Sequence, residues 1–263
     1  VSIANTSREP RLRNLYAAED SYFGAAPQFH ADTSGGNVRY DFSRPLVQPE
    51  RLLDVEIGAG FISPNAQFKV NVFLMDFSDE LVKSGQVDIF GQPVTGNAEK
   101  TRHTGIEFEG EYKLAQVLTI AGNMTLSRNR FVSHNSYEQM TDTAGNTVVQ
   151  TRTLNGNPIA GFPDAMGTVR FSYSDETLTA SLVGKYVGSF YTDNFRNEAN
   201  KNDAYSVLNG EVVQEIHIMG GVKVTLRGEV RNVLNRLYST SGDGNAFFPA
   251  AERNYIVGIT VHL

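Results

Sequence analysis

The sequence contains no cysteine, no tryptophan and no long hydrophobic run. Without cysteine, the chain cannot form disulfides, thiolate nucleophiles or zinc–thiolate sites. A transmembrane helix needs about 20 mostly apolar residues, whereas the apolar run at Val72–Met75 already ends at Asp76. A helical membrane protein is therefore excluded. The formal net charge is −6, so the chain lacks the excess of basic residues that is typical of nucleic-acid-binding proteins. We therefore expect no nucleic-acid partner.

The beginning of the chain lacks the features of a signal peptide. It starts Val1-Ser2-Ile3-Ala4-Asn5, without an initiator methionine, a basic patch or an apolar stretch. We therefore expect either a mature protein or a fragment of a longer one. By length, 263 residues correspond to one large domain or two small ones.

What the sequence does contain is a hydrophobic repeat of two residues. The clearest runs place apolar side chains at alternate positions in residues 53–61, 106–114, 222–230 and 255–263. A helix would space them three and four apart, so the pattern predicts strands with one apolar and one polar face. Weaker runs cover residues 66–82, 117–131, 165–174, 177–191 and 204–216, and residues 1–7 resemble the end of another strand. The sequence therefore predicts about ten strands.

The connections between these strands alternate in length. Short turns are expected at residues 63–65, 115–116, 174–176 and 219–221, and long polar loops at residues 8–49, 84–101, 132–163, 192–203 and 236–252. All the long loops then lie at one end of the sheet. Strands of about 10 residues with this loop pattern are typical of outer-membrane barrels, because β-sandwich strands are usually shorter. The predicted fold is an all-β, antiparallel transmembrane β-barrel with long extracellular loops and short periplasmic turns.

A soluble β-barrel or β-helix would show the same alternation, with the apolar face buried instead. The charges gather on one face of the predicted strands, while the other face is almost free of charge. This distribution favours a membrane barrel with a polar lumen, although alternation alone leaves open which face points inward. The charged rows that would line the lumen or contact a plug are Glu107, Glu109 and Glu111 in one strand, and Arg227, Glu229 and Arg231 in another.

Several segments resemble motifs of the TonB-dependent outer-membrane receptors. Residues 230–238 (VRNVLNRLY), followed by a Gly-rich loop and a final strand at 253–263, are similar to the Asn-Leu-Phe-Asp/Asn-basic-x-Tyr stretch that closes that family's next-to-last strand. Residues 102–110 (RHTGIEFEG) resemble its Gly-hydrophobic-Glu-x-Glu strand. Residues 7–10 with Leu15-Tyr16 resemble its Arg-Glu-Pro loop start, and residues 157–163 resemble the Gly/Pro segment before a later strand.

The resemblance has two departures at the C-terminal end. Leu234 replaces the usual Phe of the Asn-Leu-Phe trio, and Leu263 stands where outer-membrane barrels usually end in Phe. Gly258, Val261 and Leu263 still match the spacing of the signal that the barrel-assembly machinery reads.

The family's barrel has 22 strands and a plugged lumen, which is more than twice the predicted number. An open sheet cannot leave bare edges in hydrocarbon. The ten strands therefore either close on themselves or belong to a longer receptor. The order of the motifs favours the second possibility. Residues 1–263 would then be the C-terminal portion of the barrel, and the plug domain, the TonB-contacting segment and the N-terminal strands would lie outside this chain.

No catalytic motif is present. The chain has no Gly-x-Ser-x-Gly elbow, no Walker loop, no His-Glu-x-x-His pair and no calcium loop. We therefore expect no enzymatic activity, no cofactor and no metal site. The histidines, at positions 30, 103, 134, 217 and 262, are widely separated and are interpreted as solvated side chains, with contact between a loop histidine and an iron chelate as the alternative.

Ligand capture is expected in the long loops. The loop at residues 8–49 is rich in aromatic and arginine side chains, which suit planar anionic chelates through stacking and charge-assisted hydrogen bonds. The alternative is that these side chains pack within the loop or join interfacial girdles, as is expected for Tyr112, Tyr186, Tyr191, Tyr205, Tyr238 and Tyr255. The ligand-binding candidates are Arg8, Arg11, Arg13, Tyr16, Tyr22, Phe23 and Tyr40.

The resemblance implies active uptake across the bacterial outer membrane. A scarce ligand, most plausibly a ferric siderophore or similar metal chelate, with heme, cobalamin and oligosaccharides as other possibilities, would bind at the outer loops. TonB would then act on the plug to admit it. The implied partners are outer-membrane lipid, the plug domain, TonB, the barrel-assembly machinery and the small-molecule ligand. The alternative is a stand-alone ten-stranded barrel that acts as a surface hydrolase or adhesin.

Overall fold

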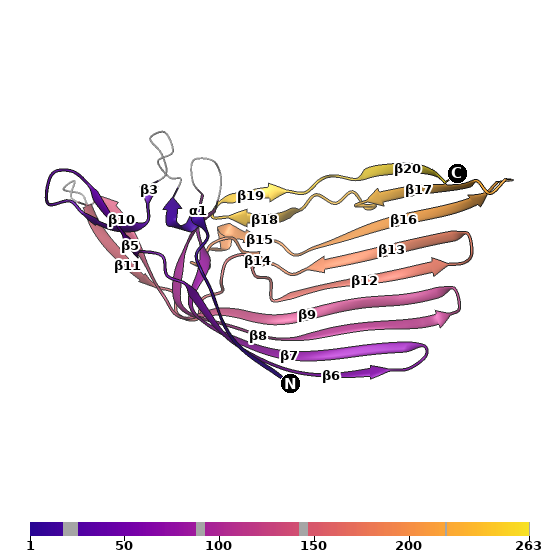
Figure 1. Ribbon diagram of the computed structural model, residues 1–263, viewed down its shortest axis with the longest axis horizontal. Helices are drawn as coiled ribbons and strands as arrows, with labels where there is room; N and C mark the ends of the chain where they lie inside the picture. Colours follow the sequence, from indigo (N-terminus) through magenta and orange to yellow (C-terminus); the bar gives the residue numbers. More distant parts are fainter. Residues whose placement is uncertain (18–25, 88–92, 142–146, 219, 263) are drawn as a thin grey trace.

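A computed structural model describes residues 1–17, 26–87, 93–141, 147–218 and 220–262. Its main feature is one antiparallel sheet of ten strands, which confirms the predicted strands and fold class (Figure 1). Each strand pairs with the next one in the series. In spatial order the strands are β1 (Ser2–Arg8), β6 (Glu50–Ile62), β7 (Ala66–Val87), β8 (Pro93–Ala115), β9 (Leu118–Ser133), β12 (Ala165–Ser174), β13 (Leu178–Val187), β16 (Tyr205–His217), β17 (Lys223–Arg231) and β20 (Asn254–His262).

Tight turns and long connections lie at opposite ends of this sheet (Figure 1). The turns join β6 to β7, β8 to β9, β12 to β13 and β16 to β17, as predicted. The long connections contain α1 (Leu12–Leu15), β2 (Tyr16–Ala17), β3 (Ala26–Pro27), β4 (Phe29–Asp32), β5 (Arg39–Pro45), β10 (Asn135–Thr141), β11 (Thr147–Thr153), β14 (Phe190–Tyr191), the 3-10 helix η2 (Glu198–Asn200), β15 (Lys201–Asn202), β18 (Ser239–Asp243) and β19 (Ala246–Pro249). No helix among the described residues is long and apolar enough to cross a membrane.

The predicted loop at 84–101 is wrong in its bounds. β7 continues to Val87 and β8 begins at Pro93, so most of this segment is strand. The segment has the polar composition typical of a loop. The reason is that β7 and β8 extend here beyond the apolar part of the sheet, where both faces tolerate polar side chains. Alternation is then lost although the backbone stays extended.

The pairing register divides the side chains between two faces, because directly opposite residues in antiparallel strands point to the same side. The apolar face carries Val55, Ile57, Val72, Ile106, Phe108, Leu126, Val169, Leu182, Val212, Leu226 and Ile259. The polar face carries Glu56, Asn71, Glu107, Glu109, Glu111, Thr125, Arg170, Ser181, Glu211, Arg227, Glu229, Arg231 and Thr260. Large apolar side chains on the first face remain open to the surroundings, with Ile259 68% exposed and Val72 52%.

Two glycines of the 102–110 segment lie under phenylalanine rings of β7. A Cβ atom on Gly105 would lie 2.6 Å from the ring of Phe73, and one on Gly110 would lie 2.7 Å from the ring of Phe68. The two pairs are directly opposite in the register, one on each face. Aromatic rings often cover glycines across strands in this way. The glycines therefore create the space that the rings occupy.

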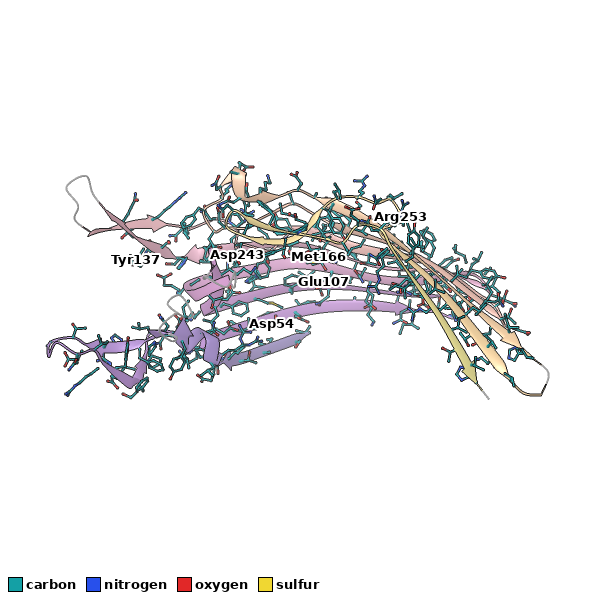
Figure 2. All side chains as sticks on the ribbon, turned by 90° about the horizontal axis from the view of Figure 1, so that it is seen from above. Asp54, Glu107, Tyr137, Met166, Asp243 and Arg253 are labelled. Atoms are coloured by element: carbon teal, nitrogen blue, oxygen red, sulfur yellow. The ribbon has the colours of Figure 1, made fainter. Side chains whose placement is uncertain are left out.

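β1 and β20 form the two edges of the sheet and do not pair with each other within the described ranges. Seen from above, the strands follow a curved arc (Figure 2). The structure thus shows a section of barrel wall, and it does not show the closed ten-stranded barrel of the alternative interpretation.

The tyrosines predicted to form an interfacial girdle do not all lie on the same face of the sheet. Tyr112, Tyr186 and Tyr255 lie on the apolar face near the strand ends and are exposed. Tyr205 instead lies on the polar face and is only 9% exposed, because its ring packs against Tyr238 with 4.6 Å between centroids. For Tyr205 and Tyr238 the girdle interpretation is wrong.

Candidate functional site

Three of the long connections pack onto the extended ends of β7, β8 and β9. Val82, Ala98 and Phe131 from these strands form a buried apolar cluster with Leu154 and Ile159 from the connection between β11 and β12. Phe195, from the connection between β14 and β15, packs against the same cluster. This small core gives the loop end of the sheet a defined shape.

Buried polar side chains join these connections to one another. Asn194 Nδ2 donates to the carbonyl oxygen of Lys83 at 2.6 Å, and Asn194 Oδ1 accepts from the Ala160 amide at 2.9 Å. The Thr192 hydroxyl, which is fully buried, bonds the carbonyl oxygens of Asn200 and Gly244. Segments from three different loops therefore share one hydrogen-bond network.

An ion pair links β7 to the hairpin of β18 and β19. Lys83 Nζ lies 3.2 Å from Asp243 Oδ2, and the Asp243 side chain is fully buried whereas that of Lys83 is 35% exposed. Neither carboxylate oxygen of Asp243 has a hydrogen-bond partner within the described part of the chain. Burial raises the pKa of Asp243, and the Lys83 ammonium acts in the opposite direction. Lys83 is therefore the main compensation for this buried carboxylate. Figure 2 shows Asp243 toward the loop end of the sheet.

A second buried network surrounds His103 on β8. Its Nε2 lies 3.1 Å from Glu80 Oε2, its Nδ1 lies 2.8 Å from Asn129 Oδ1, and the Thr101 hydroxyl donates to the same Glu80 oxygen. The ring packs against Phe77 and Phe162. The interpretation of His103 as a solvated side chain is wrong, since it is 5% exposed. Both ring nitrogens are engaged, and the described residues contain no group of three or more His, Cys, Asp or Glu side chains that could hold a metal ion.

The first long connection brings two predicted ligand-binding residues into one aromatic ladder. Tyr16 lies 5.8 Å from Phe29, Phe29 lies 5.1 Å from Phe42, and Phe42 lies 6.2 Å from Tyr40, measured between ring centroids. Phe42 is 61% exposed and Tyr40 37%. The ladder therefore offers aromatic surface outside the sheet, and sequence reasoning missed Phe29 and Phe42 as its connecting members.

The arginine candidates of this connection have different surroundings. Arg8 Nε forms an ion pair with Glu50 at 2.8 Å, so its charge is already compensated within the chain. Arg11 is exposed at the N-cap of α1, where its backbone amide donates to Asn14 Oδ1. The side chain of Arg13 and all of Tyr22 and Phe23 lie outside the described residues.

The two charged rows of the polar face differ in their partners. On β17, Arg227 contacts Glu211 at 2.6 Å and Arg231 contacts Glu229 at 2.6 Å, so this row is neutralised within the sheet. On β8, Lys69 lies 3.7 Å from Glu109, while Glu107 and Glu111 have no ion pair with any described residue. The six residues share one face, but only the β8 row carries surplus charge.

The C-terminal strand carries the residues predicted to form the barrel-assembly signal. Gly258 lies opposite Arg227 on the polar face, and Val261 lies on the apolar face with 54% of its side chain exposed. Leu263 lies outside the described residues.

Comparison with known proteins gives a family and a set of related folds. The family model for the "TonB dependent receptor-like, beta-barrel" matches residues 1–233. Among solved structures, the chain is similar to the ferric yersiniabactin uptake receptor FyuA from Yersinia pestis, with a TM-score of 0.58, 18% identity and coverage of 81% of this chain and 30% of that chain. It is also similar to the siderophore receptor PiuA from Acinetobacter baumannii, with a TM-score of 0.61, 18% identity and coverage of 87% and 32%.

The copper transporter OprC gives a TM-score of 0.64 at 12% identity, with coverage of 98% of this chain and 36% of that chain. At such identities these likenesses show the fold alone. This chain spans about a third of the length of each of the three proteins. Since the family model covers most of the sequence, the chain belongs to the TonB-dependent receptor β-barrel family, whose members are outer-membrane receptors and transporters of Gram-negative bacteria.

Proposed function

We propose that this chain is the C-terminal barrel portion of an outer-membrane receptor that takes up a ferric siderophore or similar metal chelate with TonB-coupled energy. The observation that carries the proposal is a charged sheet face with packed loops at one end only, an arrangement suited to a polar lumen below a ligand-binding surface. FyuA is a ferric yersiniabactin uptake receptor, PiuA is a siderophore receptor and OprC is a copper transporter. Their ligands support a ligand that contains a metal, and those of FyuA and PiuA support a chelate.

The aromatic ladder of Tyr16, Phe29, Phe42 and Tyr40 is the proposed ligand contact, through its exposed members Phe42 and Tyr40. Aromatic faces stack on planar chelating groups. Arg8 is a weaker candidate than its sequence position indicated, because Glu50 already pairs with it.

The acidic row on β8 is the proposed contact for the plug. Glu107 and Glu111 have no partner among the described residues, so basic groups of a plug would neutralise them. The row on β17 already contains its own counter-charges and is proposed to line the wall.

The proposal is tested in cells that express the complete receptor, by measuring uptake of radioactive iron presented as catecholate, hydroxamate and carboxylate chelates. We expect uptake of one class of chelate and loss of that uptake in cells without TonB. We expect the double variant Tyr40→Ala/Phe42→Ala to bind that chelate about 10- to 100-fold more weakly than the parent. Tyr137→Ala is the matched control, since Tyr137 is an exposed aromatic residue of another loop hairpin. Failure of all three classes to bind, or uptake that does not require TonB, would refute the proposal.

A further inference from the structure

The hydrogen bonds around His103 continue to the connection that precedes β12. Asn129 Nδ2 donates to Ser127 Oγ at 3.0 Å, and the Ser127 hydroxyl donates to the carbonyl oxygen of Pro163 at 3.4 Å. The Ser127 amide also donates to the carbonyl oxygen of Asp164, at 2.9 Å. One chain of hydrogen bonds therefore runs from His103 on β8, across β9, to residues 163 and 164.

The direction of these hydrogen bonds fixes a proton on one nitrogen of the His103 ring. The carbonyl oxygen of Pro163 can only accept, so the Ser127 hydroxyl gives its single proton to this oxygen and accepts from Asn129 Nδ2. The Asn129 amide then turns its oxygen toward the ring, where Oδ1 lies 2.8 Å from Nδ1. Because Oδ1 is an acceptor, Nδ1 carries a proton.

The other nitrogen of the ring faces a carboxylate. Nε2 lies 3.1 Å from Glu80 Oε2, which also accepts from the Thr101 hydroxyl. A hydrogen bond between Nε2 and Oε2 needs a proton on one of these two atoms. Loss of this shared proton would leave two lone pairs facing each other in a buried place, together with a net negative charge. Such a state is costly, because neither group can turn to water.

A strained residue brings the Glu80 carboxylate to this position. Strict alternation along β7 would place Glu80 on the apolar face with Asp76 and Ser78, away from the ring of His103. Asp79 interrupts the alternation with a φ of 58°, a left-handed conformation that is costly for a residue other than glycine. Glu80 therefore reaches His103 on the polar face, where it is only 8% exposed.

The ring has few charges around it. Among the described residues, Glu80 of β7 is the ionisable side chain that contacts the ring. The other groups packed against it are uncharged, namely Phe77 from β7, Asn129 from β9 and Phe162 from the connection before β12.

The next charged groups lie farther away. Asp54 of β6 lies opposite Met75, one strand beyond the ring, and Asp76 and Arg102 lie on the apolar face. Burial disfavours an isolated charge, but the pair of His103 and Glu80 is neutral as long as it holds the shared proton. The carboxylate and the Asn129 oxygen both favour the protonated ring, so the pair keeps this proton at neutral pH and loses it in alkaline solution.

Residues 157–164 depend on this pair on one side and hold a neighbouring loop on the other. The ring of Phe162 covers His103, with 5.0 Å between centroids, and the Ile159 amide donates to the carbonyl oxygen of Asn129 at 3.2 Å. On the other side, the Ala160 amide donates to Asn194 Oδ1 at 2.9 Å and the Gly161 amide to the carbonyl oxygen of Tyr191 at 2.8 Å. A displacement at the ring would therefore reach the segment at residues 191–194.

We propose that His103 and Glu80 form a proton-dependent latch at the loop end of the barrel wall. While the pair holds its shared proton, residues 157–164 stay docked on β9. When the proton is lost, this connection separates from the wall, and its hydrogen bonds to Asn194 and Tyr191 weaken with it. The inference goes beyond the proposed function and does not rest on it, since it involves neither the chelate nor TonB.

The test measures hydrogen exchange of the amides in residues 159–161 of the complete receptor in detergent, as protection factors at pH 6 and pH 9. In the parent, protection is expected to fall about 10- to 100-fold between these pH values, because the buried pair loses a hydrogen bond. Glu80→Gln has nearly the same shape, and its side-chain amide can donate to the neutral ring. Its protection is therefore expected to be equal at both pH values. Constant protection in the parent, or an equal fall in Glu80→Gln, would overturn the inference.

His134→Gln is the matched control, because His134 also contacts a carboxylate, with 2.6 Å between its Nδ1 and Glu99 Oε2. This variant is expected to keep the pH-dependent fall of the parent, and loss of the fall in the control would contradict the assignment to His103. Heat-modifiable migration in electrophoresis verifies that each variant forms a barrel.

The position of the protons is measured directly by the ¹⁵N chemical shifts of the histidine rings, with His103→Gln to assign the signal. We expect Nδ1 of His103 to be protonated at both pH values, and a ring protonated on Nε2 alone would overturn the inference. A receptor that imports its chelate but shows no such pH dependence would refute this inference and leave the proposed function intact.

Discussion

Replacing Lys83 with methionine removes the only counter-charge that the described residues provide to the buried Asp243 carboxylate. At 3.2 Å and an effective dielectric constant of about 20, the attraction is about 5 kcal/mol. Lys83 is 35% exposed, so water screens part of this attraction. We therefore expect Lys83→Met to destabilise the docked hairpin of β18 and β19 by about 2–4 kcal/mol.

The reverse substitution, Asp243→Asn, is expected to cost much less. It removes the carboxylate whose pKa burial has raised, and the remaining Lys83 can turn toward water. The effect is local, so the assay is hydrogen exchange of the amides in residues 239–249 of the complete receptor in detergent. Lys83→Met should speed exchange by about 30- to 1,000-fold and Asp243→Asn by less than about tenfold. If both variants accelerated amide exchange equally, the difference in burial between Asp243 and Lys83 would not determine how strongly this ion pair stabilises the hairpin.

Two further predictions concern the faces and the turns. Val224→Arg on the apolar face is expected to destabilise the complete barrel by about 2–4 kcal/mol if it lies near the midplane of the bilayer, whereas Thr225→Arg on the polar face should cost far less. Both are measured by urea unfolding in lipid, and equal shifts would mean that the assignment of the two faces is wrong. In the turn between β12 and β13, hydrogen bonds from the Tyr173 hydroxyl and the Thr177 and Leu178 amides lower the pKa of Asp175 to about 2. Because this pKa is lowered, the ionised carboxylate stabilises the turn at pH values above about 3.9, the pKa of Asp in the unfolded chain, and the stabilisation is lost as the pH falls toward 2. Amide exchange at Leu178 should therefore remain slow at pH 4 in the parent but not in Asp175→Ala.

The strands were predictable where one face is apolar and the other polar. The run at residues 165–174 coincides with β12, and the run at 204–216 differs from β16 by one residue at each end. The prediction failed at 84–101, because β7 and β8 continue there with polar side chains on both faces. Periodicity reports the difference between two environments, so it gives no signal where a strand extends beyond the apolar part of the sheet.

The loop contacts were beyond sequence reasoning for another reason. His103 and Glu80 are 23 residues apart and Lys83 and Asp243 are much farther apart, so no local spacing connects them. Only the pairing of β7 with β8 and the docking of the β18–β19 hairpin bring these charges together. The tyrosines show the same limit, because Tyr205 and Tyr255 both lie near strand ends, yet one is buried on the polar face and the other is exposed on the apolar face.

The charged rows show what the register adds to a pattern. In the sequence, the glutamates of β8 and the mixed charges of β17 are equivalent signs of a polar face. The register sets Glu211 of β16 opposite Glu229, Arg227 contacts Glu211 diagonally and Arg231 contacts Glu229, so β17 needs no further partner. Among the described residues, the three carboxylates of β8 have one ion pair, that of Glu109 with Lys69. Because closely spaced like charges repel each other, the stronger case for contact with a basic plug surface lies at Glu107 and Glu111.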